Sequence, residues 1–329
     1  MKRFGINGFR WAISAGWFLD GLLCFGIFCS GVSGIRSAMA QVAVSGIPYY
    51  TVSEDAGNGG KAEKDDCRNE RCRLDIWLPS TGTAGATDGN AATNGGKMPF
   101  ATIVWFHGGG LTGGERYLPE SLRRVAVERR VVVVAVGYRL APQAQFPEYI
   151  EDAAAAAAWV KRHIAEYGGD PDRIFLCGGS AGAYLAAMVI MDPRWLDPYG
   201  LHADDFAGLI PVSGQMTTHF LVKQQLGIPG NSYLPVIDKN APLGHLSMRL
   251  PPILLVLGDR RREWKARVEE NEFMASSLRA IGFDEVTLRE HAGFDHGISG
   301  LGDDCTPQVT PEIVDFVLET RPARQRDGQ

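Results

Sequence analysis

The sequence Phe175-Leu176-Cys177-Gly178-Gly179-Ser180-Ala181-Gly182-Ala183 joins a short apolar run to a run of small residues through a Gly-x-Ser-x-Gly pattern. This arrangement is typical of a strand that enters a tight turn and continues as a helix, which is the context of a nucleophile elbow. The pattern alone is a weak signal, because serine is common in turns. Ser180 is therefore a candidate nucleophile whose function depends on what precedes and follows it in the chain.

A glycine-rich loop, His107-Gly108-Gly109-Gly110, follows the apolar run 101–106. Acyl transfer through a serine builds negative charge on a tetrahedral oxygen, and glycines allow backbone N–H groups to approach that oxygen closely. The N–H group of Ala181, directly after the candidate nucleophile, would complete such an oxyanion hole. A phosphate-binding loop is the alternative, but the dinucleotide-binding and P-loop glycine patterns are both absent at this turn.

A base for the serine is sought among seven histidines. His296 lies in Gly293-Phe294-Asp295-His296-Gly297, after the last predicted core strand and before the last predicted helix. A lone histidine in a loop is most often a surface residue. Here the order serine, acid, histidine along the chain is that of α/β-hydrolases, which favours His296 as the general base.

Four motifs occur in an order that resembles the α/β-hydrolase superfamily, in particular the hormone-sensitive-lipase-like and feruloyl-esterase-like carboxylesterases. They are 107–110, Gly137-Tyr138-Arg139-Leu140-Ala141-Pro142, 178–182 and Asp295-His296-Gly297. The resemblance covers residue 99 to the C-terminus. It implies Ser180 as nucleophile and His296 as general base and acid, and it implies that no metal or organic cofactor is needed. It further implies oxyanion donors at Gly108, Gly109 and Ala181.

The triad acid of this family lies in the turn after the seventh strand, which here reads Gly-Asp-Arg-Arg-Arg-Glu-Trp over 258–264. The usual position holds Arg261, and an arginine cannot orient a histidine N–H or stabilise an imidazolium. Either Asp259 or Glu263 reaches in from the same turn, or the triad is incomplete. We favour Asp259, because it is nearest the end of the strand, and keep Glu263 as the alternative acid.

Apolar runs alternate with helical segments from residue 99 onward. Such alternation predicts an α/β fold with a mostly parallel central sheet and helices on both faces. We expect 41–98 to hold N-terminal strands and flexible loops, 99–322 the hydrolase core, and 323–329 a tail. The segment 213–250 interrupts the alternation and predicts a cap-like pocket insertion, in which His219 is a candidate substrate-binding residue.

The N-terminal segment 1–40 predicts a secretory signal peptide. Basic residues precede an apolar run at 11–35, and Ala38-Met39-Ala40 is a cleavage pattern before Gln41. A retained membrane anchor is the rival interpretation. Export predicts a secreted or periplasmic protein with no membrane contact after cleavage, in a compartment where Cys67 and Cys72 can form a disulfide; Cys305 has no assigned partner.

A net charge of −5 provides no basic field for nucleic acid. The sequence predicts a serine carboxylesterase that hydrolyses small esters, with acetyl, short acyl or aryl groups and possible carbohydrate alcohols, through an acyl-enzyme. Two alternatives stay open at this point. One is an exopeptidase on the same fold, and the other is a non-catalytic hydrolase-fold binding protein with a degraded triad acid.

Overall fold

The structure is a computed structural model that describes residues 41–50, 70–79, 99–264 and 266–321. The predicted signal peptide, its anchor alternative, the tail 323–329 and Cys67 of the predicted disulfide lie outside these residues. Within them, Cys72, Cys177 and Cys305 are free and buried. No described helix has the length and apolar character needed to cross a membrane.

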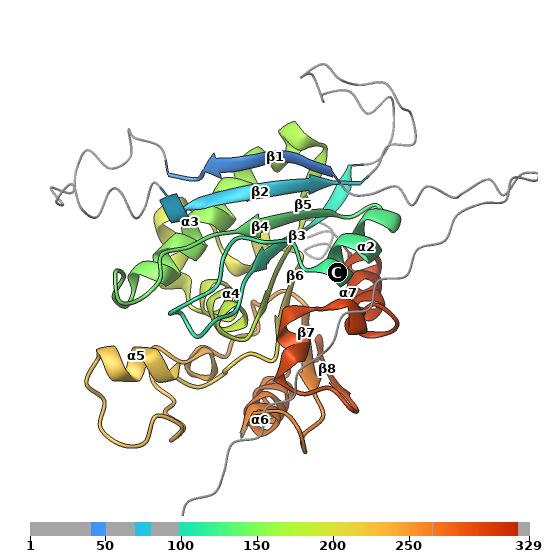
Figure 1. The fold of residues 1–329 in the computed structure, drawn as a ribbon. Helices are drawn as coiled ribbons and strands as arrows, with labels where there is room; N and C mark the ends of the chain where they lie inside the picture. Colours follow the sequence, from blue (N-terminus) through green and yellow to red (C-terminus); the bar gives the residue numbers. More distant parts are fainter. Residues whose placement is uncertain (1–40, 51–69, 80–98, 265, 322–329) are drawn as a thin grey trace, which may run out of the picture. The chain divides into compact units, whose positions relative to one another are not determined.

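The described strands form one sheet with the order β1-β2-β4-β3-β5-β6-β7-β8 (Figure 1). Their bounds are β1 Gln41–Pro48, β2 Arg73–Leu78, β3 Phe100–Phe106, β4 Val132–Val136, β5 Gly169–Gly179, β6 Gly208–Val212, β7 Ile253–Gly258 and β8 Val286–His291. The β1–β2 and β2–β4 pairs are antiparallel, and the pairs from β4 to β8 are parallel. The predicted α/β fold with a mostly parallel sheet is confirmed.

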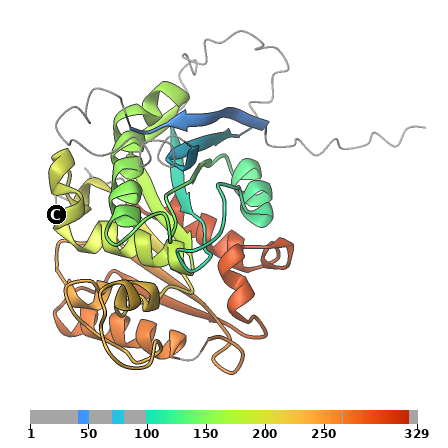
Figure 2. The same ribbon diagram turned by 60° about the vertical axis from the view of Figure 1, so that its left-hand side comes forward.

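Helices cover both faces of the sheet, as Figure 2 shows. Their bounds are α2 Glu120–Glu128, α3 Glu148–His163, α4 Ala181–Met191, α5 Phe220–Gln225, α6 Arg267–Ala280 and α7 Val309–Glu319. Successive side chains of a strand point to opposite faces. Val104 of β3 therefore packs in one apolar cluster with α3, α4 and α6, while Trp105 packs in the other with α2 and α7.

The parallel strands end at one edge of the sheet, where ligands bind in open α/β sheets. The loops after β3, β5, β6, β7 and β8 meet there, and they carry the residues that the sequence singled out. The segment 213–250 between β6 and β7 contains α5 and one turn of 3-10 helix at Pro242–Gly244. Its beginning contacts α6, because the N–H of Met216 donates to Glu270 over 3.0 Å.

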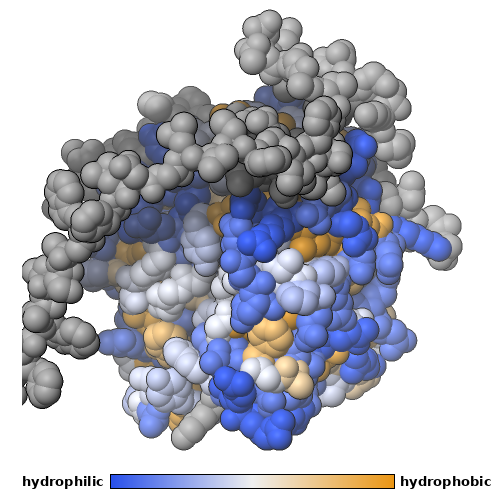
Figure 3. Space-filling model, turned by 45° about the vertical axis from the view of Figure 1, so that its right-hand side comes forward, coloured by the Kyte–Doolittle hydropathy of each residue, from blue (hydrophilic) through white to orange (hydrophobic). Residues whose placement is uncertain are grey.

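The surface in view in Figure 3 is mostly hydrophilic, and its apolar residues form small separate patches wherever described atoms are visible. Large exposed apolar side chains include Leu226, Tyr233 and Trp264. Two of these three, Tyr233 and Trp264, line a cavity that is described below.

Candidate active site

Ser180 is held in a strained backbone conformation between β5 and α4. Its φ of 52° and ψ of −113° lie in a region that side-chain-bearing residues rarely adopt. The glycines of the pattern permit this turn, because a Cβ on Gly178 would lie 2.5 Å from the carbonyl oxygen of Gly182, and one on Gly182 would lie 2.1 Å from that of Phe106. The Gly-x-Ser-x-Gly pattern therefore reflects close backbone contacts on both sides of Ser180.

His296 begins a short 3-10 helix, His296–Gly300, in the loop that follows β8. Its Nε2 lies 2.9 Å from the Oγ of Ser180, and its Nδ1 lies 2.6 Å from Oε1 of Glu263. The indole ring of Trp264 stacks on the imidazole with a centroid separation of 4.5 Å and an interplanar angle of 11°. Stacking and two hydrogen bonds together fix the plane and the position of the imidazole.

The carboxylate of Glu263 is completely buried and fully engaged. Oε1 accepts from the N–H of Trp264 over 2.9 Å as well as from His296, while Oε2 accepts from the hydroxyl of Ser213 and from the N–H of Gly258 over 3.3 Å. Burial alone would raise the pKa of Glu263. The hydrogen bonds from His296, Ser213 and Trp264 outweigh burial and hold this pKa below its usual value, so the side chain is an anion beside the imidazole.

The structure corrects the preference for Asp259 as the residue that contacts His296. Asp259 instead accepts from Nη2 of Arg261 over 3.1 Å and from the N–H of Gly293 over 3.2 Å. The reason lies in the turn after β7, where the N–H of Glu263 donates to the carbonyl oxygen of Asp259 over 2.8 Å. This single helical turn brings residue 263 back over the end of the strand. Closeness in sequence to the strand end was therefore the wrong criterion for choosing the acid.

The loop 107–110 lies against the elbow. A Cβ on Gly108 would be 3.1 Å from the carbonyl oxygen of Gly179, and Gly109 has a φ of 115° at a place where a Cβ would be 2.2 Å from Gly113 O. In the described part of the chain, no protein acceptor takes a hydrogen bond from the N–H groups of Gly108, Gly109 or Ala181. These N–H groups are therefore available to a bound ligand.

His107 supports this loop from behind. Its Nδ1 donates to the carbonyl oxygen of Gly108 over 2.7 Å, and its ring stacks on Tyr138 at a centroid distance of 4.3 Å. The Tyr138 hydroxyl donates to the carbonyl oxygen of His107 over 2.6 Å. Burial lowers the pKa of His107 to about 4, so the imidazole is neutral near pH 7 and its role is to hold the loop in position.

A cavity of about 300 Å³ lies beside Trp264. The residues that line it are Gln215, Phe220, Tyr233, Trp264, Arg267 and Glu270. His219, the predicted substrate-binding residue, is not among them. Its Nδ1 accepts from the N–H of Leu221 at the start of α5, and its ring packs on Phe220 at 4.2 Å between centroids.

His219 is buried and packs against Phe220. The structure therefore corrects the prediction that His219 binds substrate. Burial lowers the pKa of His219 to about 3, so this histidine is neutral. No sequence motif marks Trp264, Arg267 and Glu270 as pocket residues. The signal that was present is their position, because Trp264 ends the turn that carries the acid, and Arg267 and Glu270 follow within the next six residues. Among the described residues, no group of three or more His, Cys, Asp or Glu side chains is placed to hold a metal ion.

Comparison with known proteins places this geometry in context. A family profile described as alpha/beta hydrolase fold matches residues 103–299. The chain is 29% identical over 231 residues to the probable carboxylic ester hydrolase LipM of Mycobacterium tuberculosis, which covers 63% of this chain and 51% of LipM. It is 42% identical over 232 residues to the esterase LipQ of the same organism, which covers 65% of this chain and 54% of LipQ. The chain thus spans about half the length of the curated relatives it matches.

Among solved structures, the apo form of Thermogutta terrifontis esterase 2 superimposes with a TM-score of 0.61 at 23% identity, covering 87% of this chain and 98% of that one. At this level of identity the similarity concerns the fold. The loops that hold Ser180, His296 and Glu263 in this chain are consistent with that fold, in which such residues follow the parallel strands.

Proposed function

The chain belongs to the α/β-hydrolase family, and on this premise we propose that it is a serine carboxylesterase that hydrolyses small carboxylic esters through an acyl-enzyme. One observation carries the proposal. The Oγ of Ser180, both ring nitrogens of His296 and the carboxylate of Glu263 form a continuous chain with separations of 2.9 and 2.6 Å. Curated relatives named as ester hydrolases support the same reaction class.

The first half of the reaction transfers the acyl group to the enzyme. Ser180 Oγ attacks the ester carbonyl carbon while Nε2 of His296 takes the hydroxyl proton. Glu263 accepts the hydrogen bond from Nδ1–H, which selects the tautomer with a free Nε2 and stabilises the imidazolium that forms. Collapse of the tetrahedral intermediate breaks the bond to the alcohol oxygen, and His296 returns its proton to that oxygen.

The second half releases the acid. His296 removes a proton from water, the hydroxide attacks the acyl carbon, and Ser180 leaves with the proton restored by His296. In both halves, negative charge develops on the former carbonyl oxygen. We assign its stabilisation to the N–H groups of Gly108, Gly109 and Ala181, which donate to no acceptor in the described part of the chain.

The non-catalytic alternative rested on the arginine at the usual position of the acid. Arg261 is 83% exposed and pairs with Asp259, so it does not enter the site, and Glu263 supplies a carboxylate from two residues further on. This arrangement supports an active enzyme. No feature of the described residues favours an exopeptidase over an esterase.

We further propose that the protein is exported, with 1–40 as the signal peptide. The proposal rests on the Ala38-Met39-Ala40 pattern before Gln41. N-terminal sequencing of the protein after expression with its full leader should begin at Gln41 in the extracellular or periplasmic fraction. An intact N-terminus in the membrane fraction would favour the anchor instead.

The esterase proposal is tested by turnover of p-nitrophenyl butyrate by the wild type and by Ser180→Ala. The wild type is expected to hydrolyse the ester, and the variant is expected to lose at least about 10⁴-fold in kcat, on the scale seen when a nucleophilic serine is removed. Unchanged melting of the variant serves as the folding control. Equal activity of the two proteins would overturn the assignment of Ser180.

A further inference from the structure

The cavity of about 300 Å³ adjoins the proposed catalytic residues on two sides. Its wall residue Trp264 stacks on His296. Its wall residue Phe220 lies against the oxyanion loop, because a Cβ on Gly110 would be 3.2 Å from Cζ of Phe220. A group attached to an ester bound at Ser180 would therefore enter this cavity.

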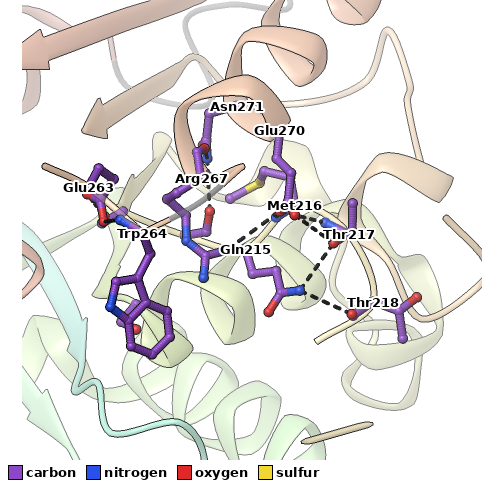
Figure 4. Close-up of polar contacts among 12 residues, drawn as sticks. Gln215, Met216, Thr217, Thr218, Glu263, Trp264, Arg267, Glu270 and Asn271 are labelled. Carbon is purple, nitrogen blue, oxygen red and sulfur yellow. Dashed lines mark hydrogen bonds and ion pairs between the residues drawn. The ribbon is translucent and has the colours of Figure 1, made fainter. Parts of the chain in front are cut away.

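Arg267, the first residue of α6, brings a buried positive charge to the cavity. Its side chain is 7% exposed, and its only ion pair with a described residue is a long contact of 3.6 Å from Nη1 to Oε2 of Glu270. The Nε–H is buried, and no acceptor in the described part of the chain takes its hydrogen bond. Figure 4 shows the guanidinium between Trp264 and Gln215, directed away from α6. Burial lowers the pKa of Arg267 from its ordinary value, so the folded protein holds this charge at a cost.

The other polar residues of the wall do not satisfy this arginine. Glu270 is engaged by the turn after β6, since it accepts from the N–H groups of Met216 and Thr217 over 3.0 and 3.4 Å and from the Thr217 hydroxyl over 3.0 Å. Gln215 directs its amide N–H groups to Thr217 and to the carbonyl oxygen of Thr218, as Figure 4 shows. Its Oε1 is buried, and no described residue donates a hydrogen bond to it.

Among the described residues, the wall thus offers no acceptor for the Nε–H of Arg267 and no donor for the amide oxygen of Gln215. A cationic ligand does not fit, because the carboxylate of Glu270 already has three hydrogen bonds and an arginine beside it. A carboxylate does fit, because its two oxygens match the planar donors of a guanidinium. A hydroxyl on the same ligand would satisfy Oε1 of Gln215.

We propose that Arg267 binds a carboxylate of the substrate, so that the preferred substrates are anionic esters with a carboxylate a few bonds from the scissile bond. This inference rests on the proposed esterase function and narrows its substrate class. The carboxylate belongs either to the acyl part, as in a half-ester of a dicarboxylic acid, or to the alcohol part, as in an acylated hydroxy acid.

The test compares matched esters in the wild type, with acid release followed by titration at constant pH. Monoethyl succinate against ethyl butyrate places the charge on the acyl side, and acetoxyacetate against ethyl acetate places it on the alcohol side; in both pairs the carboxylate replaces a methyl group. In one of the two pairs the anionic ester is expected to have a kcat/KM at least about 10-fold higher, as expected for hydrogen bonds to a charged group. The pair that shows the preference identifies the side.

Arg267→Gln is expected to reduce that preference ratio by about 10- to 100-fold, mainly through KM for the anionic ester. The matched control is Arg261→Gln, which removes the same charge from a side chain that is 83% exposed, and it should leave the ratio unchanged. The inference is overturned if the wild type shows no preference in either pair. It is also overturned if Arg267→Gln and Arg261→Gln reduce the preference ratio equally.

The two proposals fail in distinguishable ways. Absence of turnover for every ester, including p-nitrophenyl butyrate, would contradict the esterase function itself. Turnover of neutral esters without a preference for anionic ones would contradict only the role of Arg267. The wild-type comparison needs no variant, so poor folding of Arg267→Gln does not prevent a decision.

Discussion

Replacing Glu263 with glutamine removes the negative charge behind His296 while it keeps the size of the side chain. The carboxylate oxygen lies 2.6 Å from Nδ1 in a completely buried position. With the charge centres about 4 Å apart and an effective dielectric constant of about 20, the attraction between carboxylate and imidazolium is about 4 kcal/mol. Its loss alone slows formation of the imidazolium by about 10³-fold.

The amide also disturbs the tautomer of His296. If the new NH₂ group faces Nδ1, the ring carries its proton on Nε2 and cannot accept the proton of Ser180. If the amide oxygen faces Nδ1, the NH₂ group faces the N–H of Gly258, and a buried donor loses its acceptor. Both arrangements add to the loss of charge, so Glu263→Gln is expected to lower kcat by about 10³- to 10⁴-fold.

The matched control is Asp259→Asn in the same turn. Asp259 contacts Arg261 and Gly293 and not the imidazole, so kcat is expected to stay within about 10-fold of the wild type. Both variants are assayed on p-nitrophenyl butyrate, with circular dichroism and thermal melting to verify folding. A 10³-fold loss in Asp259→Asn together with near-normal activity in Glu263→Gln would refute this assignment of the acid, by the same scale.

Two further predictions concern buried partners of the site. Ser213→Ala removes a hydroxyl that donates to Glu263, so kcat is expected to fall about 10-fold; an unchanged kcat would count against this role. His219→Asn keeps an acceptor at the start of α5 but removes a histidine whose pKa burial lowers to about 3, below the 6.5 of an unfolded chain. As the pH falls below 6.5, only the unfolded chain takes up this proton, so the wild type loses stability. Between pH 7.5 and 5, its free energy of unfolding in urea should fall about 2 kcal/mol more than that of the variant. Equal decreases in the two proteins would contradict a neutral, buried His219.

The parts of the site that could be predicted from sequence are those imposed by the backbone. Close contacts at Gly178 and Gly182 and the positive φ of Gly109 require glycine, so the elbow and the loop after β3 leave a visible pattern. His296 could be located because its place after the last strand follows from chain order. Fully apolar strands such as β4 indicate a sheet covered on both faces.

The parts that sequence could not predict depend on how a turn folds back. Position along the chain favours Asp259, whereas the hydrogen bond from Glu263 N–H to Asp259 O closes the turn and brings Glu263 to His296. Likewise, His219 and Phe220 are neighbours in the chain, but the start of α5 buries one and turns the other toward the cavity. Arg267 has no motif, and its importance follows only from its burial beside a cavity.

Covalent labelling of Ser180 tests the central claim most directly. A fluorophosphonate reacts with a serine only when a neighbouring base activates it, so the wild type is expected to gain one phosphonyl group. Peptide mass spectrometry should place that group on Ser180, and Ser180→Ala should stay unmodified. An unlabelled wild type, or labelling at another residue that persists in Ser180→Ala, would contradict the claim that Ser180, His296 and Glu263 form a working catalytic triad.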